Sequence, residues 1–190
     1  MDSLEREVSV MHNFVEVMYE IPIGFLCIAI VFCCVLWIIS AYFYMKKTWW
    51  RILNATVFIV TFVMVIMITL LYRESEKKGV FLIPFFGFSA AKQHHDIYNQ
   101  MVLNVVLFFP FGLSLPFCIC TVFKHPVVFS IVFALILSVI IEVLQYVFAC
   151  GYSELDDVML NTIGAACGAS AYLIACLANK KWQKGRIKVG

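Results

Sequence analysis

The sequence predicts an all-α fold, a bundle of about five membrane-spanning helices with a re-entrant or interfacial segment at residues 80–91. Of the 190 residues, 63% are hydrophobic and only 14% are charged, which gives a mean hydropathy of +0.94. A soluble domain of this length cannot bury that much apolar surface in one core. The apolar runs are also too long and too continuous for the alternating strands of a membrane β-barrel.

Five apolar runs are each long enough to cross about 30 Å of hydrocarbon at about 1.5 Å per residue. They cover residues 21–45, 52–72, 101–123, 126–149 and 158–178. We expect a single transmembrane domain over 21–178, preceded by an acidic extracytoplasmic leader (1–20) and followed by a basic cytoplasmic tail (179–190). The eight cysteines form no CxxC pair and mostly lie within the apolar runs, so we interpret them as small apolar residues.

The distribution of Lys and Arg predicts the orientation, because cytoplasmic loops of membrane proteins are enriched in these residues. With the N-terminus outside and the C-terminus inside, nine of the 14 lie on the inside. They are Lys46, Lys47, Arg51, Lys124, Lys180, Lys181, Lys184, Arg186 and Lys188. We therefore expect a multi-pass protein of the cell membrane.

Residues 80–91 are apolar but too short to span a bilayer, and Pro84 and Gly87 interrupt them. Segments of this kind are more often interfacial or re-entrant. We expect an apolar flap on the outer face, beside the polar residues described next.

Polar residues that are unusual in lipid gather at the predicted outer ends of the spans. They are Arg73, Asn104, Glu142, Gln145, Asp156, Asp157 and Asn161. Ionisable groups at membrane depth are costly and are functional candidates by default. The small residues of 164–171 allow close helix packing, which we expect to bring Glu142 beside Asp157 and Asn161.

Structural roles compete with a ligand site at several of these positions. Asp156 or Asp157 is well placed to cap the last span, and we favour that role for Asp156. Arg73 is the most plausible partner of Glu142, so a purely structural ion pair and a ligand site remain equally open. Glu142 is the residue hardest to explain by structure alone, since it lies about two turns inside an apolar run.

His94, His95 and Asp96 could in principle hold a divalent metal together with Glu142 and Asp157, but the pattern is weak, and we expect no metal and no cofactor. His94 and His95 are adjacent in a loop and lack the i, i+4 spacing of helical metal motifs. No GxSxG, HExxH, P-loop or dinucleotide fingerprint is present.

Five short motifs resemble the VanZ-like membrane proteins, in their order and spacing as well as their residues. They are Thr-Leu-Leu-Tyr-Arg (69–73), Leu-Ile-Pro-Phe (82–85), Asn-Val-Val-Leu-Phe-Phe-Pro-Phe-Gly (104–112), Glu-Val-Leu-Gln (142–145) and Asp-Asp-Val-Met-Leu-Asn-Thr-Ile-Gly (156–164). Two positions depart from the family pattern. The family often has Asn where this chain has Phe81, and often has Arg shortly before the Asp pair, where 151–155 has none.

The resemblance implies a small polytopic protein of the bacterial cytoplasmic membrane, in a family named for a member that raises resistance to the glycopeptide teicoplanin. We expect a protein that acts on or binds a membrane lipid or lipid-linked envelope precursor at the outer leaflet, and no nucleic acid. Arg73 would pair with an anionic head group, and the other polar residues would hydrogen-bond it. The alternative is a membrane-embedded hydrolase or transferase with Glu142 and Asp157 as catalytic candidates. A proton-coupled transporter is a third hypothesis, disfavoured because the polar groups lie on one side.

Overall fold

The computed structural model describes residues 35–39, 41, 47–71, 77–85, 87 and 95–189. The chain separates into two compact units, residues 1–33 and 34–190, and every described residue belongs to the second.

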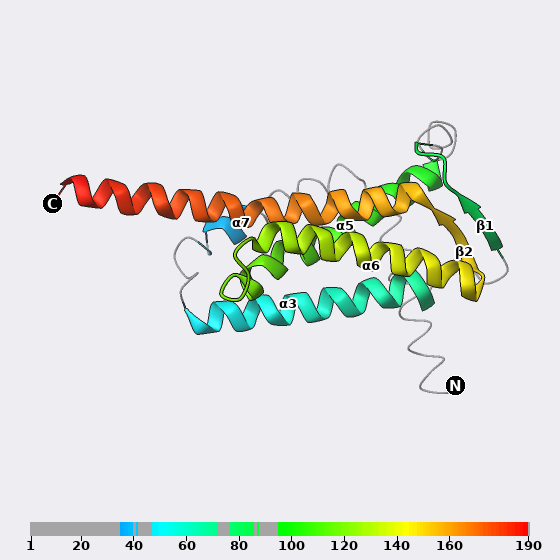
Figure 1. The fold of residues 1–190 in the computed structure, drawn as a ribbon, viewed down its shortest axis with the longest axis horizontal. Coiled ribbons are helices and arrows are strands. Elements are labelled where there is room, and N and C mark those ends of the chain that lie inside the picture. Colours follow the sequence, from blue (N-terminus) through cyan, green and yellow to red (C-terminus); the bar gives the residue numbers. More distant parts are fainter. Residues whose placement is uncertain are drawn as a thin grey trace. The chain divides into compact units, whose positions relative to one another are not determined.

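Long helices make up most of the second unit (Figure 1). They are α3 (Thr48–Ile66), continued by the π-helical turn η1 (Met67–Leu71), α5 (His95–Ile119), α6 (Pro126–Phe148) and α7 (Leu155–Val189). Within the described residues, four helical stretches are long and apolar enough to cross a membrane: Thr48–Leu70, Ile97–Ile119, Pro126–Phe148 and Leu155–Ala178.

These helices confirm the predicted all-α membrane bundle, with boundaries that differ from the sequence prediction by a few residues. The first predicted span, 21–45, lies outside the described residues except for 35–39 and 41, which are helical. The predicted basic tail continues the backbone of α7 as far as Val189.

A short parallel strand pair was not predicted. β1 (Lys77–Phe81) pairs with β2 (Cys150–Glu154), with Lys77 opposite Cys150 and Phe81 opposite Glu154. Part of the segment expected to be a flap is therefore a strand, and the described residues that follow it, 82–85, form a turn.

The turn between α6 and β2 depends on backbone conformations that most residues avoid. Ala149, the C-cap of α6, has a φ of 54°, and its N–H donates to the carbonyls of Gln145 and Tyr146. Gly151 has a φ of 133°, which glycine adopts without a steric penalty. Because the turn is this tight, α6 and α7 are joined by little more than β2.

Helices α5 and α7 approach each other at backbone distance. A Cβ atom at Gly164 would overlap the backbone of Val105, and one at Gly168 would overlap that of Phe109. On the α5 side, a Cβ at Gly112 would meet Ala165. The small residues of α7 do allow close packing, as expected, but the helix that uses it is α5.

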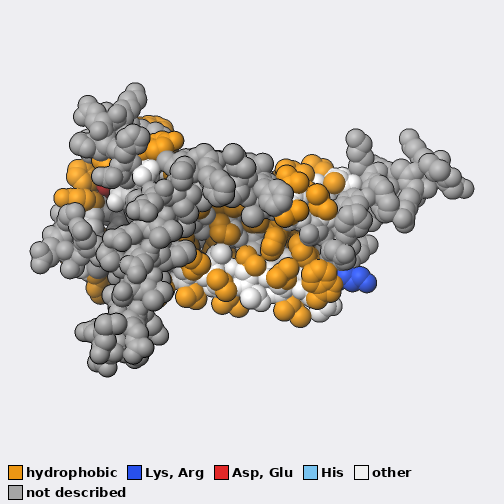
Figure 2. All heavy atoms as spheres, turned by 180° about the vertical axis from the view of Figure 1, so that it is seen from behind, with side chains coloured by type: hydrophobic (Ala, Val, Ile, Leu, Met, Phe, Trp, Pro, Cys, Tyr) orange, Lys and Arg blue, Asp and Glu red, His pale blue; other side chains and the backbone are white. Residues whose placement is uncertain are grey.

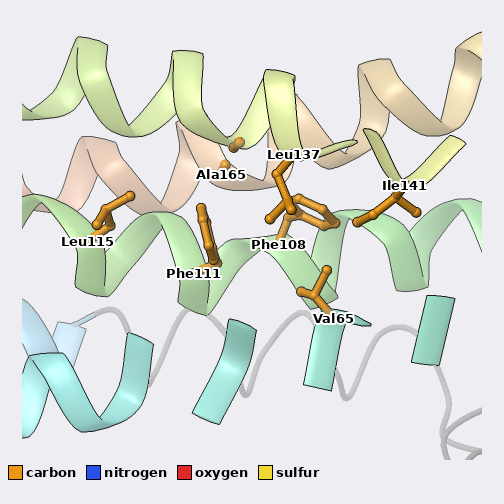
Figure 3. Close-up of a cluster of buried hydrophobic side chains, with 8 residues drawn as sticks. Val65, Phe108, Phe111, Leu115, Leu137, Ile141 and Ala165 are labelled. Atoms are coloured by element: carbon orange, nitrogen blue, oxygen red, sulfur yellow. The ribbon is translucent and has the colours of Figure 1, made fainter. Parts of the chain in front are cut away.

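A cluster of buried apolar side chains joins all four helices, as Figure 3 shows. It comprises Val65, Phe108, Phe111, Leu115, Ala134, Leu137, Ile141 and Ala165. Outside this core, large apolar side chains are exposed along α3, α6 and α7, and they dominate the described surface in Figure 2. An apolar outer surface around an apolar core is the arrangement of a protein solvated by lipid, where close packing holds the helices together.

Candidate functional site

The predicted polar residues that the structure describes lie at one end of the bundle. Here β1 and β2 meet η1, the first turns of α5 and α7, and the last turns of α6 (Figure 1). Most of the polar side chains are buried: Glu142, Gln145, Asp156, Asp157 and Asn161. Arg73 lies outside the described residues, so its predicted pairing with Glu142 stays a prediction.

Asp157 and Asn104 link α7 to α5. The Nδ2 group of Asn104 donates a hydrogen bond to Oδ1 of Asp157 over 2.6 Å. The contact is possible because Gly164, two turns further along α7, lets the two backbones come together. A hydrogen bond to an ionised acceptor is shorter and stronger than one between neutral groups. This contact therefore fixes the orientation of the Asp157 carboxyl group.

Asp156 holds the turn that follows β1. Its carboxylate accepts the backbone N–H of Phe85 over 2.7 Å and that of Gly87 over 2.8 Å. Phe85 has a φ of 65°, a left-handed conformation that non-glycine residues seldom adopt. Asp156 does lie in the first turn of α7, where its charge suits the helix dipole. The contact with the backbone of Phe85 and Gly87 is a role that the cap interpretation did not include.

Glu142 and Gln145 connect α6 to its neighbours through backbone atoms. Oε2 of Glu142 accepts the N–H of Glu154 in β2 over 2.8 Å. Nε2 of Gln145 donates to the carbonyl oxygen of Thr69 over 2.8 Å. Thr69 lies in η1, two residues before its last residue, Leu71. The polar face of α6 thus fixes both β2 and η1.

Asn161 meets α6 at Ser138, one turn before Glu142 in the sequence. Its Nδ2 group donates to the Ser138 hydroxyl over 2.8 Å. The amide is 2% exposed, and its Oδ1 atom has no hydrogen-bond partner in the described part of the chain. A buried acceptor left unsatisfied costs about 1–3 kcal/mol. The predicted meeting of α6 and α7 occurs, but through Ser138 and Asn161.

The structure therefore brings together six of the seven predicted residues, through contacts that mostly involve atoms the sequence could not identify. The backbone N–H groups of Phe85, Gly87 and Glu154 and the carbonyl of Thr69 complete the layer. Ser138, the partner of Asn161, lies at i, i+4 spacing from Glu142, so these two side chains share one face of α6. Among the residues that the structure describes, no group of three or more His, Cys, Asp or Glu side chains could hold a metal ion. The side chains of this layer are carboxyl and amide groups. Both can bind polar groups, and the carboxyl groups can also transfer protons.

Comparison with known proteins establishes the family. Residues 25–177 match the family model described as VanZ/LLP1. The chain belongs to the VanZ/LLP1 family. It is also 35% identical over 75 residues to Protein VanZ of Enterococcus faecium, a match that covers 40% of this chain and 45% of that protein. The chain thus spans less than half the length of this curated relative, and no solved structure matches it.

Family membership confirms the resemblance drawn from the sequence motifs. With four helices suited to span a membrane, the chain is a VanZ-like multi-pass membrane protein. The polar layer described above lies entirely within the matched residues.

Proposed function

We propose that this VanZ-like protein binds a membrane lipid or lipid-linked envelope precursor at the outer leaflet, and thereby lowers susceptibility to glycopeptide antibiotics such as teicoplanin. The ligand would contact the polar layer at the end of the bundle. Residues for this role are Arg73, Asn104, Glu142, Gln145, Asp156, Asp157 and Asn161.

The observation that carries the proposal is the Oδ1 atom of Asn161. It is buried without a partner in the described part of the chain, one helical turn from Asp157. In a low-dielectric interior an unsatisfied acceptor is costly, and a ligand that supplies an N–H or O–H donor would remove that cost. A polar head group carries such donors, and its lipid chains suit the apolar surface around the helices.

The distribution of basic side chains supports placing this layer at the outer leaflet. Lys47, Arg51 and Lys124 are exposed, and they lie at the start of α3 and between α5 and α6, at the opposite end of the helices. Arg51 donates a hydrogen bond to the Thr121 hydroxyl over 3.1 Å. Because basic residues favour the cytoplasmic side, the polar layer faces outward, with the N-terminus outside and the C-terminus inside a bacterial cytoplasmic membrane.

The hydrogen bonds divide the residues of the layer into those that hold the backbone and those that would contact the ligand. Asp156 holds the backbone of Phe85 and Gly87 in position, and Gln145 holds η1 through the Thr69 carbonyl. Asn161 offers an acceptor to the ligand, and Asp157, oriented by Asn104, lies on the same face of α7. Arg73 would neutralise an anionic part of the head group.

Antibiotic susceptibility of cells expressing matched variants tests the proposal. Asn161→Leu, Glu142→Ala and Asp157→Ala should each abolish teicoplanin resistance while membrane levels, measured by immunoblot, stay unchanged. Ser138→Ala is the control for Asn161, because it removes the partner of Nδ2 and leaves Oδ1 in place. Full resistance in well-expressed Asn161→Leu cells contradicts the proposal.

A second candidate function is a membrane-embedded hydrolase or transferase acting on a lipid-linked substrate. The 2.6 Å contact from Asn104 favours it, since it positions a carboxylate that could act as a general base. Purified protein would then convert lipid-linked substrates, followed by mass spectrometry with and without divalent metal, and Asp157→Ala would stop the conversion. Binding without conversion under these conditions would leave the first function as the sole candidate.

A further inference from the structure

The turn after β1 exposes large apolar side chains next to the polar layer. Leu82, Ile83 and Phe85 are 68%, 67% and 59% exposed, and Val80 in β1 is 47% exposed. Water-exposed apolar clusters of this size are unusual and mark sites of contact with a membrane or another protein.

β2 and the outer part of α6 also expose apolar side chains. Val147 and Phe148, at the end of α6, and Tyr152, in β2, are also exposed, and the ring of Tyr152 packs edge-on against Phe81 at 5.3 Å. Earlier in α6, Val139, Ile140 and Val143 are also exposed. This helix is long and apolar enough to cross the bilayer. Figure 2 shows hydrophobic side chains at this end as well as along the helices. Tyrosine near the end of a span is typical of the membrane interface.

We propose that the turn at residues 82–85 inserts into the outer leaflet of the bilayer, and that Asp156 is the positioning residue that allows it to do so. The surface partner is lipid, because Asp156 connects this turn to the first turn of α7, and α7 is long and apolar enough from Leu155 onward to cross the bilayer.

The contacts of Asp156 explain how a non-helical turn can lie in lipid. Backbone N–H groups that enter hydrocarbon must be satisfied within the protein, and Asp156 accepts those of Phe85 and Gly87. A Cβ atom at Gly87 would lie 3.1 Å from Oδ2 of Asp156, so the carboxylate fits closely against the turn. It also holds Phe85 in its left-handed conformation, which L-residues rarely keep without such support.

If the turn inserts, the polar layer lies next to lipid on the side of this turn. A lipid-borne ligand would reach the layer from within the leaflet, without passing through water. The insertion itself does not depend on the proposed function, since it concerns only the turn and the bilayer.

A polarity-sensitive fluorescent amino acid at Ile83, placed in the full chain and studied in nanodiscs, tests the proposal. Brominated phosphatidylcholine should quench this reporter about as strongly as one at Val143 on the lipid-facing side of α6, and iodide in the buffer should quench it weakly. A reporter at the exposed Lys124 should show the reverse pattern. Quenching by iodide and not by lipid at Ile83 would overturn the insertion and indicate a water-exposed turn, and protection from both quenchers would indicate a protein partner.

A second pair of variants tests the role of Asp156. Asp156→Ala should shift the Ile83 reporter toward iodide quenching and reduce lipid quenching, whereas Asp157→Ala, which changes the adjacent acid on α7, should leave the pattern unchanged. An unaltered pattern in a folded Asp156→Ala variant overturns the positioning role. Neither measurement involves an antibiotic, so a failure here is distinct from a failure of the proposed function.

Discussion

Asn104 on α5 and Asp157 on α7 are joined by a 2.6 Å hydrogen bond, 53 residues apart in the sequence. The bond lies at the end of the α5–α7 interface where Gly164 packs on the backbone of Val105. Polar recognition and close backbone packing are therefore coupled at this interface, since neither Asn104 nor Asp157 could reach the other across wider-spaced helices.

The first prediction concerns the strength of that bond. A double-mutant cycle with Asn104→Ala and Asp157→Ala should give a coupling energy of about 1–2 kcal/mol, in the range of interhelical hydrogen bonds in membranes and of bonds to charged groups. The measurement is reversible unfolding of the purified protein in mixed micelles. Strictly additive effects of the two substitutions would contradict a direct bond.

The second prediction concerns the packing that allows it. Gly164→Val should destabilise the protein by about 1–3 kcal/mol, because the added atoms overlap the Val105 backbone and force α5 and α7 apart. Cys167→Leu is the control, since Cys167 lies on the same helix and its side chain is exposed. Equal stability of the two variants in the same unfolding assay would show that the close approach is not required.

The sequence predicted the spans well because they depend on a property that every residue of a span shares. Lipid contact and a hydrocarbon thickness of about 30 Å demand long apolar runs, which hydropathy reveals directly. The strands lacked such a signal. Lys77–Phe81 and Cys150–Glu154 are five residues each, with no alternating pattern, and they pair across more than 70 intervening positions.

The residues of the polar layer could be predicted from the sequence, but most of their hydrogen-bond partners could not. Asp156 and Glu142 stood out because acids in apolar surroundings are rare. Their partners are backbone groups of Phe85, Gly87 and Glu154, whose availability depends on a turn that the residue types do not specify. Gly164 and Gly168 likewise signalled a close approach without identifying α5 as the helix involved.

A third prediction concerns a non-glycine residue in the left-handed conformation. In the described part of the chain, Phe85 and Ala149 have this conformation, and the substitution is made at Ala149. Ala149 is the C-cap of α6, with a φ of 54°, where glycine avoids the steric cost of a Cβ atom. Ala149→Gly should stabilise the protein by about 0.5–1 kcal/mol. The same change at Ala166, inside α7, should destabilise it by about 1 kcal/mol, so a loss of stability at both positions would refute the expectation.

The fourth prediction compares two buried amide side chains, Gln145 and Asn54. Gln145 donates to the Thr69 carbonyl, and Asn54, on α3, donates to the Trp50 carbonyl one turn earlier, while its Oδ1 has no partner in the described part of the chain. Gln145→Leu should cost about 1–3 kcal/mol, because it removes the buried donor to the Thr69 carbonyl and with it a hydrogen bond between two segments. Asn54→Leu should be neutral or stabilising by about 1 kcal/mol, because it removes an unsatisfied acceptor from an apolar interior and leaves Trp50 with its helical hydrogen bonding. Both variants are read out by thermal unfolding in detergent. A larger loss at Asn54 than at Gln145 would mean that the Asn54 oxygen is satisfied in the membrane by a group such as a bound water molecule or lipid hydroxyl.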